Sequence, residues 1–401
     1  MPTTALRDPR FRRLLLGQSL SSFGDSALYL SLAIWAKDLT GNNSAAGMVF
    51  FALGCASLLA PAGGYLVDRV VYRRRLLMCT EAVTALAVCS LLLVHSRDQL
   101  WLLYTVVIVY GLSANIIGPA TTALLKDMLA DTDVGSANAL RQTLDQGLRL
   151  LSPIVGAGLY EGLGGGALAL FDAATFLAAI VAVASVRVTE SRPVPAVDRL
   201  PFHREIRAGF GHLFAQPVLR RLSTASAAAM LAIGFYVSID FAVVAALGQK
   251  PSFFGILMSV QGAGSVLGGL LVTVTMRRMS ETHTVAIGLA CFAAASAGLT
   301  IKAMPVVFAA AVVLGAGISF FVVGLYTAQQ RLTPARLQGR VSAASYVITD
   351  IPQTVSIGIG AALITVVDYR VLLGVLVVVT ATCAISLIFP RPLDQQAPSE
   401  S

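Results

Sequence analysis

Long apolar segments recur along the whole chain, and they constrain its fold more than any other feature. Stretches of about 20 residues or more, each long enough to cross the hydrocarbon core of a bilayer as a helix, alternate with short charged or Gly/Pro-bearing breaks. Hydrophobic residues make up 56% of the chain and charged residues only 12%, against about 25% charged residues in soluble proteins. The sequence therefore predicts an all-α membrane protein.

Hydropathy predicts twelve transmembrane helices in two groups of six. The first group is Phe11–Trp35, Ser44–Val67, Leu76–Val94, Leu100–Leu125, Ala137–Tyr160 and Ala167–Val186. The second group is Leu222–Leu247, Phe253–Thr275, Val285–Ile301, Val306–Gln330, Val341–Val366 and Val371–Phe389. The expected domains are an N-terminal bundle (1–186), a cytoplasmic linker that includes a short surface helix (187–221), and a C-terminal bundle with a short cytoplasmic tail (222–401).

Basic residues predict the orientation, because cytoplasmic loops are enriched in Lys and Arg. One side of the predicted membrane collects Arg7, Arg10, Arg12, Arg13, Arg69, Arg73, Arg74, Arg75, Lys126, Arg141, the linker arginines, Arg277, Arg278, Arg331, Arg336, Arg340 and Arg391. The opposite loops hold only Lys37, Arg97, Lys250, Lys302 and Arg370. Both termini are therefore predicted to be cytoplasmic, in a cell (inner or plasma) membrane.

Several functional classes are disfavoured by what the sequence contains. The net charge of +8 follows from the loop asymmetry, and the loops are too short to build a nucleic-acid-binding face. Five cysteines lie in apolar helices without metal-ligand spacing, and four histidines stand singly. We expect no enzyme activity, no metal and no cofactor, with a proton gradient as the driving force.

An internal repeat relates the two predicted halves at an offset of about 205 residues, as in transporters built from two related bundles. The matched pairs are Gly111 with Gly315, Gly135 with Gly339, Asp145 with Asp350, and Gly156 with Gly360. Each predicted helix pairs with the sixth helix after it in the same orientation. The repeat thus predicts a parallel pseudo-two-fold arrangement about the membrane normal.

A polar stripe in the first predicted helix is the leading candidate for a functional site. Gln18, Ser21, Ser22 and Tyr29 share one face with Asp25 at helical spacings. A carboxylate near mid-membrane is costly unless it is paired or hydrated, and burial disfavours its ionised form. Asp25 is therefore predicted to load and release a proton in a water-filled cavity; the alternative is a carboxylate held permanently by neighbouring helices.

The fifth predicted helix carries a charged ladder of Arg141, Asp145 and Arg149, which a spacing of four places on one face. The ladder has two open interpretations. It is either a structural ion cluster or a cavity wall in which Arg149 binds an anionic group or keeps Asp145 ionised.

Four further acids lie within predicted helices. Asp350 is the repeat partner of Asp145, and Asp240 lies with Tyr236 toward the outer end of the seventh predicted helix. Asp240 and Asp350 are candidates for cavity lining. Glu81 and Asp172 lie nearer helix starts, where interfacial solvation or capping would explain them.

The loop between the second and third predicted helices resembles the signature loop of the major facilitator superfamily. It reads Gly64-Tyr65-Leu66-Val67-Asp68-Arg69-Val70-Val71-Tyr72-Arg73-Arg74-Arg75 and keeps the family's Gly64, Asp68, Arg69, Arg73 and Arg74. Val71 replaces the family's glycine and Tyr72 its first arginine. The resemblance implies a twelve-helix fold in two halves and a cytoplasmic gate at this loop.

A narrower resemblance is to the branch of macrolide exporters and the enterobactin exporter. It is carried by Asp8-Pro9-Arg10-Phe11-Arg12-Arg13-Leu14, Gly24-Asp25, Ala137-Asn138-Ala139-Leu140, Phe171-Asp172-Ala173-Ala174-Thr175-Phe176 and Gly339-Arg340-Val341. The fifth predicted helix also resembles a proton-antiporter motif at Ser152, Pro153 and Gly156. The basic residue that many drug antiporters carry in the fourth helix is missing, and Arg149 is a possible substitute.

Together these features predict a monomeric secondary transporter that exports a small hydrophobic compound (an antibiotic, another drug as in multidrug resistance, or a siderophore-like metabolite) by proton antiport and alternating access. The expected partners are the substrate, protons and lipid. An importer or symporter is the alternative within the same class. From a different class, a non-transporting membrane sensor or assembly partner would use the same scaffold.

Overall fold

A computed structural model describes residues 5–190, 202–334 and 337–389, and this part of the chain forms fourteen α-helices and three short 3-10 helices. The fold is the predicted all-α membrane protein of twelve transmembrane helices in two pseudo-symmetric halves. The predicted linker residues 191–201 and the tail from 390 lie outside the described residues.

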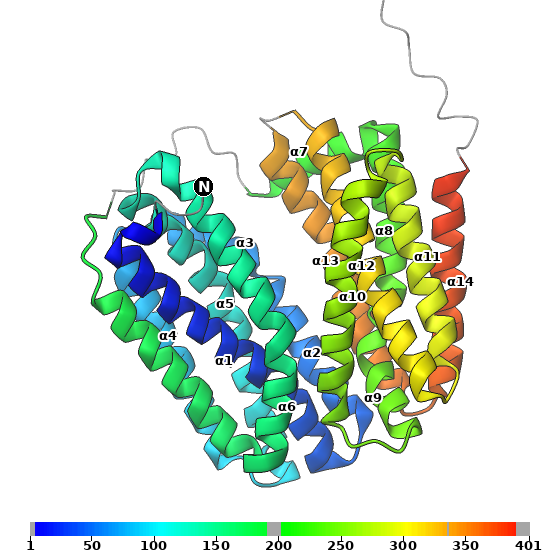
Figure 1. The fold of residues 1–401 in the computed structure, drawn as a ribbon, viewed down its shortest axis with the longest axis horizontal. Coiled ribbons are helices and arrows are strands. Elements are labelled where there is room, and N and C mark those ends of the chain that lie inside the picture. The colour runs from blue at the N-terminus through cyan, green and yellow to red at the C-terminus, as the bar shows by residue number, and fades with distance from the viewer. Residues whose placement is uncertain (1–4, 191–201, 335–336, 390–401) are drawn as a thin grey trace, which may run out of the picture. The chain divides into compact units, whose positions relative to one another are not determined.

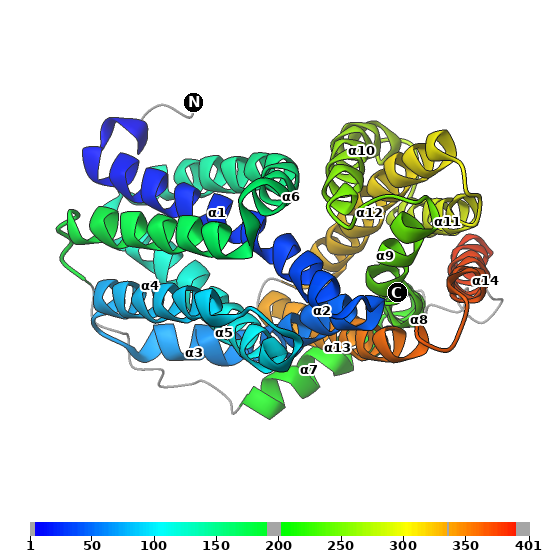
Figure 2. The same ribbon diagram turned by 90° about the horizontal axis from the view of Figure 1, so that it is seen from below.

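Contacts divide the chain into two compact units, each described here by itself. The first comprises Met1–Val197 with Lys250–Ser259, and the second comprises Asp198–Gln249 with Val260–Ser401. The helices of the first unit are α1 (Pro9–Thr40), α2 (Asn43–Ser57), α3 (Ala60–Arg69), α4 (Arg73–Ser90), α5 (Leu100–Met128) and α6 (Asp131–Ala184). Within it α1 runs along α6, and α4 packs on both α5 and α6 (Figures 1 and 2).

The second unit has the same general plan. Its helices are α7 (Phe202–Ala215), α8 (Pro217–Ile233), α9 (Tyr236–Ala246), α10 (Phe253–Thr275), α11 (Glu281–Leu299), α12 (Met304–Leu332), α13 (Gln338–Leu363) and α14 (Tyr369–Ile388). The residues of α10 before Val260 are assigned to the first unit. Here α11 packs on α12 and α14, while α13 packs on α7 and α8. The helix α7 lies in the segment predicted as the linker's short surface helix.

Two predicted helices are broken rather than continuous, which corrects the sequence-based boundaries. The second predicted helix splits into α2 and α3 around Leu58 and Leu59. There Asn115 of α5 donates a 2.8 Å hydrogen bond to the carbonyl of Ala56, which also accepts one of 3.1 Å from the backbone N–H of Leu59. The seventh predicted helix splits into α8 and α9, which are bent by 45°. Gly234 at this break lies so close to α13 that a Cβ there would be 2.5 Å from the carbonyl oxygen of Gln353. The backbone of α8 or α13 would therefore have to move for any larger residue to fit at position 234.

The fifth and sixth predicted helices form one element, α6, that turns back within itself. Gly164 has φ 81° and ψ 169°, which is non-helical backbone that residues with a Cβ rarely adopt. The turn at Gly164 therefore marks the predicted loop between Tyr160 and Ala167, and the second segment of α6 runs from there to Ala184.

The internal repeat appears in the contacts of each unit. In the first unit, a Cβ on Gly111 of α5 would meet Ala56 of α2, and in the second unit a Cβ on Gly315 of α12 would meet the backbone of Gln261 in α10. Gly156 likewise contacts α1, and Gly360 contacts the break between α8 and α9. These two repeat pairs thus let helices of their own unit approach closely, which is the packing role of small residues in membrane bundles. Gly339, by contrast, has nothing within 4 Å of its would-be Cβ.

Among the described residues, seven helices are long and apolar enough to cross a membrane, or eight if α8 and α9 form one span. The helices outside this count include α1, α13 and the start of α6 before Leu151. These three carry several of the predicted site residues, including Asp25, Asp145 and Asp350.

The entry into α1 is stabilised by Asp8, the first residue of the branch resemblance. Its Oδ1 accepts a 2.7 Å hydrogen bond from the backbone N–H of Arg10, so it caps the helix N-terminus. A side-chain hydrogen bond from Arg10 holds the pKa of Asp8 below its usual value. The cap is therefore ionised, as the positive end of the helix dipole favours.

Candidate functional site

Asp25 lies in the middle of the 32-residue α1, and its immediate partners come from other helices. The hydroxyl of Tyr110 on α5 makes a hydrogen bond to its carboxyl group, and Glu81 and Asp145 are near enough to interact with it electrostatically. Its Oδ1 is buried without a hydrogen-bond partner. A carboxyl group in this setting is costly to ionise, which is the condition that favours proton binding.

Glu81 of α4 lies beside the predicted polar stripe rather than at a hydrated helix end. Its side chain is fully buried, and its Oε1 accepts a 2.6 Å hydrogen bond from Nε2 of Gln18. The hydroxyl of Thr121 on α5 donates to Oε1 of Gln18 at 3.3 Å, whereas Oε2 of Glu81 has no partner. The expectation that interfacial solvation explains Glu81 is therefore wrong, because helix packing removes it from water.

The expectation that interfacial solvation or capping explains Asp172 is also wrong. It lies in the second segment of α6 and is fully buried, with Oδ2 unpartnered. Its Oδ1 is 2.3 Å from the point that a Cβ on Gly24 would occupy, so it lies directly against α1. Capping does not explain this residue, because the only described hydrogen bond to its carboxyl comes from Thr175, at 3.3 Å.

The charged ladder is partly formed. Nη1 of Arg141 lies 3.4 Å from Oδ2 of Asp145, and the two side chains are 24% and 19% exposed. The side chain of Arg149 lies outside the described residues. Because Asp145 also acts on Asp25, the ladder is electrostatically connected to the first helix. Both interpretations of the ladder stay open, and the partial exposure is what a cavity wall requires.

The remaining residues of the stripe have ordinary packing contacts. The backbone carbonyl of Ser22 accepts a 2.8 Å hydrogen bond from Ser26, and the ring of Tyr29 packs edge-on against Phe50 with centroids 5.0 Å apart. Ser21 is buried. Gln18 and Asp25 thus make hydrogen bonds to polar side chains of other helices. Ser22 and Tyr29 lie next to them on α1, as the helical spacing predicts.

The second unit places its two candidate acids in separate surroundings. Asp240 lies on α9, one turn after Tyr236, whose hydroxyl is 2.5 Å from Oγ of Ser296. Asp350 lies on α13 and its Oδ2 accepts a 2.7 Å hydrogen bond from Thr349. Within this unit the described side chains do not form a second cluster of acids like that around Asp25.

The loop with the family signature is held to the first unit by Arg73. Its Nη1 lies 3.1 Å from Oδ2 of Asp127 at the end of α5, and both side chains are largely buried. Arg69 is exposed, and the side chain of Asp68 lies outside the described residues. Gly64 has nothing near its would-be Cβ, whereas a Cβ on its neighbour Gly63 would be 2.4 Å from the carbonyl oxygen of Asn115. Close packing within the unit thus requires the glycine before the signature position.

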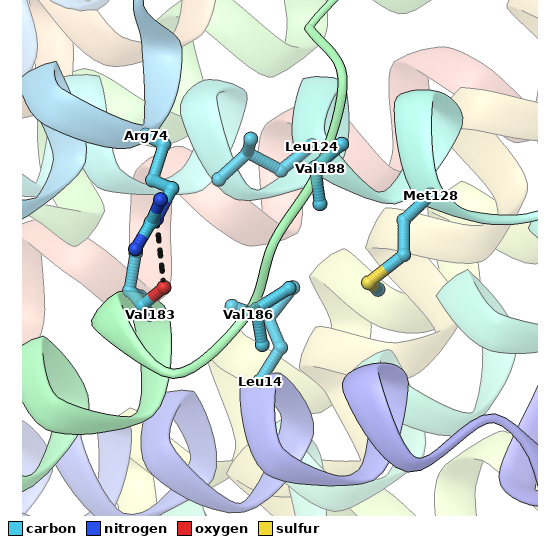
Figure 3. Close-up of a pocket in the computed structure, with 7 residues that line it drawn as sticks. All are labelled: Leu14, Arg74, Leu124, Met128, Val183, Val186 and Val188. Atoms are coloured by element: carbon cyan, nitrogen blue, oxygen red, sulfur yellow. Dashed lines mark hydrogen bonds between the residues drawn. The ribbon is translucent and has the colours of Figure 1, made fainter.

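Arg74 joins this loop to the end of α6. Its Nε and Nη2 donate to the carbonyls of Val183 (3.0 Å) and Ala184 (2.5 Å), as the dashed line to Val183 in Figure 3 shows. Both carbonyls lie in the last turn of α6, where a cation favours the helix dipole. That of Val183 also accepts a 3.2 Å hydrogen bond from the backbone N–H of Val186. The backbone N–H of Arg74 in turn donates to Glu190 at 3.2 Å. Arg74 therefore acts as a structural clamp inside the unit.

The small cavity beside Arg74 is not a substrate site. Its volume is about 10 Å³, room for about one water molecule. Apart from Arg74 its lining is apolar, with Leu14, Leu124, Met128, Val183, Val186 and Val188 around it (Figure 3). It belongs to the apolar core at this end of the unit, which also contains Phe11 and Leu77.

We expect the pair of Arg73 and Asp127 to stabilise the first unit measurably. Hydrogen bonds between charged groups contribute about 1.5–3 kcal/mol when partly buried, so Asp127→Asn should lower the unfolding free energy by about that amount. A double-mutant cycle with Arg73→Gln, monitored by thermal unfolding in detergent, isolates the pair from other effects. The matched control is Asp98→Asn at an exposed site. Equal stability losses for Asp127→Asn and Asp98→Asn would contradict this assignment.

The antiporter-like residues of the fifth predicted helix lie in the first segment of α6. Ser152 and Pro153 are buried, and Oγ of Ser152 donates to the carbonyl of Leu148 at 2.7 Å. A Cβ on Gly156 would be 2.3 Å from the carbonyl oxygen of Ala27 in α1. The glycine is thus required by helix packing, and its role in proton antiport stays a prediction.

Sequence reasoning missed Glu81, Tyr110 and Asp172 as neighbours of the predicted site. Tyr110 gave a signal, because it lies well inside a predicted helix, where a phenol needs a partner. Glu81 and Asp172 lie nearer the predicted helix starts and gave no such signal. No three His, Cys, Asp or Glu side chains in the described part are placed to hold a metal ion together. The chemistry that this arrangement supports is reversible proton binding by buried carboxyl groups.

Comparison with known protein families gives a match over nearly the whole chain. The model of the Major Facilitator Superfamily matches residues 14–353 and 224–401. No curated protein matches the sequence significantly.

Solved structures with the same fold include transporters of different cargo. A mutant of the nucleoside transporter NupG has a TM-score of 0.76 at 12% identity, covering 94% of this chain and 99% of that one. A bacterial homologue of the iron transporter ferroportin, in an inward-facing state, has a TM-score of 0.72 at 15% identity and covers 96% and 99%. An auto-inhibited peptide transporter of the POT family has a TM-score of 0.74 at 11% identity and covers 98% and 99%. At such low identity these similarities concern the fold alone.

Proposed function

Because the chain belongs to the Major Facilitator Superfamily, we propose that it is a proton-coupled exporter of a small hydrophobic compound that works by alternating access. The coarser statement needs no proposal: the family and the fold neighbours indicate a multi-pass membrane transporter of small molecules rather than an enzyme. Direction, cargo and coupling ion belong to the proposal, as do the cell membrane, the cytoplasmic termini and the monomeric state.

One observation carries the proton coupling: Asp25 lies at the centre of α1 with a buried, unpartnered carboxyl oxygen and further acids beside it. Lipid and protein interiors exclude charge, so an acid at this depth marks a pathway or coupling site more often than a packing site. Protonation removes the charge while a transporter changes its access from one side to the other. Asp25 is therefore the residue that takes up and releases the coupled proton.

Export of a hydrophobic compound is supported by the branch resemblance at Gly24-Asp25 and at Phe171-Asp172, the two segments that meet in the structure. The known members named for that branch export macrolides and enterobactin. Ser152, Pro153 and Gly156 add the resemblance to the antiporter motif. An importer or symporter remains the alternative, since fold neighbours handle nucleosides, peptides and iron.

The test uses purified protein in liposomes that contain a pH-sensitive dye. The compounds tested are tetraphenylphosphonium, erythromycin and enterobactin, each added with and without an imposed pH gradient. For an antiporter we expect one of them to move against its own gradient while protons move in the opposite direction. Protons moving in the same direction as the compound would show symport, and transport of a compound without proton movement would refute proton coupling.

A further inference from the structure

Asp172 is placed against Gly24, the neighbour of Asp25 in the chain, by the contact between α1 and the second segment of α6. Its Oδ1 and the hydroxyl of Thr175 lie 2.3 and 2.5 Å from the would-be Cβ of Gly24, the residue immediately before Asp25. Only a glycine leaves room for this approach. The carboxyl group of Asp172 therefore lies against the backbone of α1 at the level of Asp25.

The carboxyl group of Asp172 has few polar partners of its own. The hydroxyl of Thr175 makes its shorter hydrogen bond to the backbone carbonyl of Asp172 (2.7 Å) and lies 3.3 Å from Oδ1. The oxygen Oδ2 of Asp172 is buried without a partner, as is Oδ1 of Asp25. Two buried carboxyl groups from different helices thus each have an oxygen that no described donor satisfies.

The described titratable groups that act on the two acids lie on α1, α4, α5 and α6. The hydroxyl of Tyr110 on α5 bonds to Asp25 and interacts electrostatically with Asp172. Glu81 of α4 and Asp145 of α6 act on Asp25, and Tyr29 of α1 acts on Tyr110. Asp25 acts on Asp172 directly. Asp25 thus has three acids as neighbours, one of which is Asp172, while the acid that acts on Asp172 is Asp25 itself.

We propose that Asp172 is the second carboxyl group of the proton site, so that Asp25 and Asp172 titrate as one coupled pair. Two like charges that interact in a buried setting cannot both form without a large cost, so one carboxyl group keeps its proton when the other releases one. The inference rests on the proposed function, because it adds a residue to the same site. The proposed function assigns the proton to Asp25 alone, whereas here proton release by Asp25 depends on whether Asp172 is protonated.

The experiment is an infrared pH titration of the purified protein, which follows the C=O stretch of protonated carboxyl groups and needs no substrate. Difference spectra compare the natural sequence with Asp25→Asn, Asp172→Asn and the exposed control Asp98→Asn. We expect two titration steps that belong to the carboxyl groups of Asp25 and Asp172. In either single variant one step should vanish and the remaining one should move by about one pH unit or more, the size of coupling that defines an interacting pair.

The outcomes separate the two proposals. If Asp172→Asn leaves the titration of Asp25 unchanged, the coupled pair is refuted while Asp25 can still carry the proton. If Asp25→Asn removes no titrating carboxyl group, the proton site itself is refuted. Should Asp172→Asn fail to give monodisperse protein, Thr175→Val keeps both acids and removes the hydroxyl beside Asp172; it should shift the pair's titration, and an unchanged titration would overturn the proposal.

Discussion

Asp25→Asn is expected to abolish gradient-driven transport while leaving the protein folded. Asparagine has nearly the same volume and can still accept the hydrogen bond from Tyr110, but it cannot bind and release a proton. With one proton exchanged per substrate, a gradient of one pH unit supplies about 1.4 kcal/mol, which supports a concentration ratio of about ten. In the variant this ratio should fall to about one. The measurement is the steady-state accumulation of the transported compound in liposomes under an imposed pH gradient.

Two controls make this result specific to the proton. Asp38→Asn is the same substitution on the same helix, at an exposed acid that accepts a hydrogen bond from Tyr160, and it should keep the accumulation. Substrate exchange without a gradient should also persist in Asp25→Asn, since binding and alternation need no net proton movement. Undiminished accumulation in Asp25→Asn would remove Asp25 from the coupling mechanism.

Gly156→Ala is expected to cause the largest loss of stability among simple glycine substitutions in the first unit. The added Cβ would lie 2.3 Å from the carbonyl oxygen and 2.8 Å from the carbonyl carbon and Cα of Ala27. Because these are backbone atoms of α1, a whole helix must shift rather than one side chain. Overpacking of this kind costs about 1–3 kcal/mol and occasionally more. Thermal unfolding in detergent measures the loss.

The matched control is Gly158→Ala, two residues further along α6. Gly158 is exposed and has nothing within 4 Å of its would-be Cβ, so alanine there should stabilise the helix by up to about 1 kcal/mol. Gly360→Ala tests the repeat-related site, where the nearest atoms are a ring carbon of Phe235 at 3.0 Å and its Cα at 3.2 Å. The change in stability caused by Gly360→Ala should lie between those of Gly156→Ala and Gly158→Ala. Equal stability of Gly156→Ala and Gly158→Ala would show that the contact with α1 is not tight.

Much of the fold was predictable because hydropathy is a local property of the chain. A helix in lipid must satisfy its own backbone hydrogen bonds, so each long apolar segment implies one helix wherever it lies. The range predicted for α10, Phe253–Thr275, agrees with the observed helix at both ends. The breaks in the second and seventh predicted helices were not predictable in this way. They depend on contacts with α5 and α13, which supply the hydrogen bond to Ala56 and the close approach at Gly234.

The candidate site was predictable only where one helix carries it. Spacing along α1 brings Gln18, Ser22 and Asp25 to one face, and the structure places them there. The roles of Glu81 and Asp172 were misjudged because position along a helix was used as a measure of depth. Both side chains are fully buried, since neighbouring helices cover them whatever their distance from a helix end.

The sequence by itself thus determined that this protein is a membrane-embedded helical bundle in two related halves, with an ionisable residue in its first helix. These properties follow from hydrophobicity, charge and periodicity, which are read residue by residue. Only the tertiary structure decided which groups meet that residue. Tyr110, Glu81 and Asp172 are far from Asp25 in the chain and reach it through the packing of α5, α4 and α6 around α1. Contacts of this kind depend on glycines such as Gly24 and Gly156, whose effect appears only when two helices are placed together.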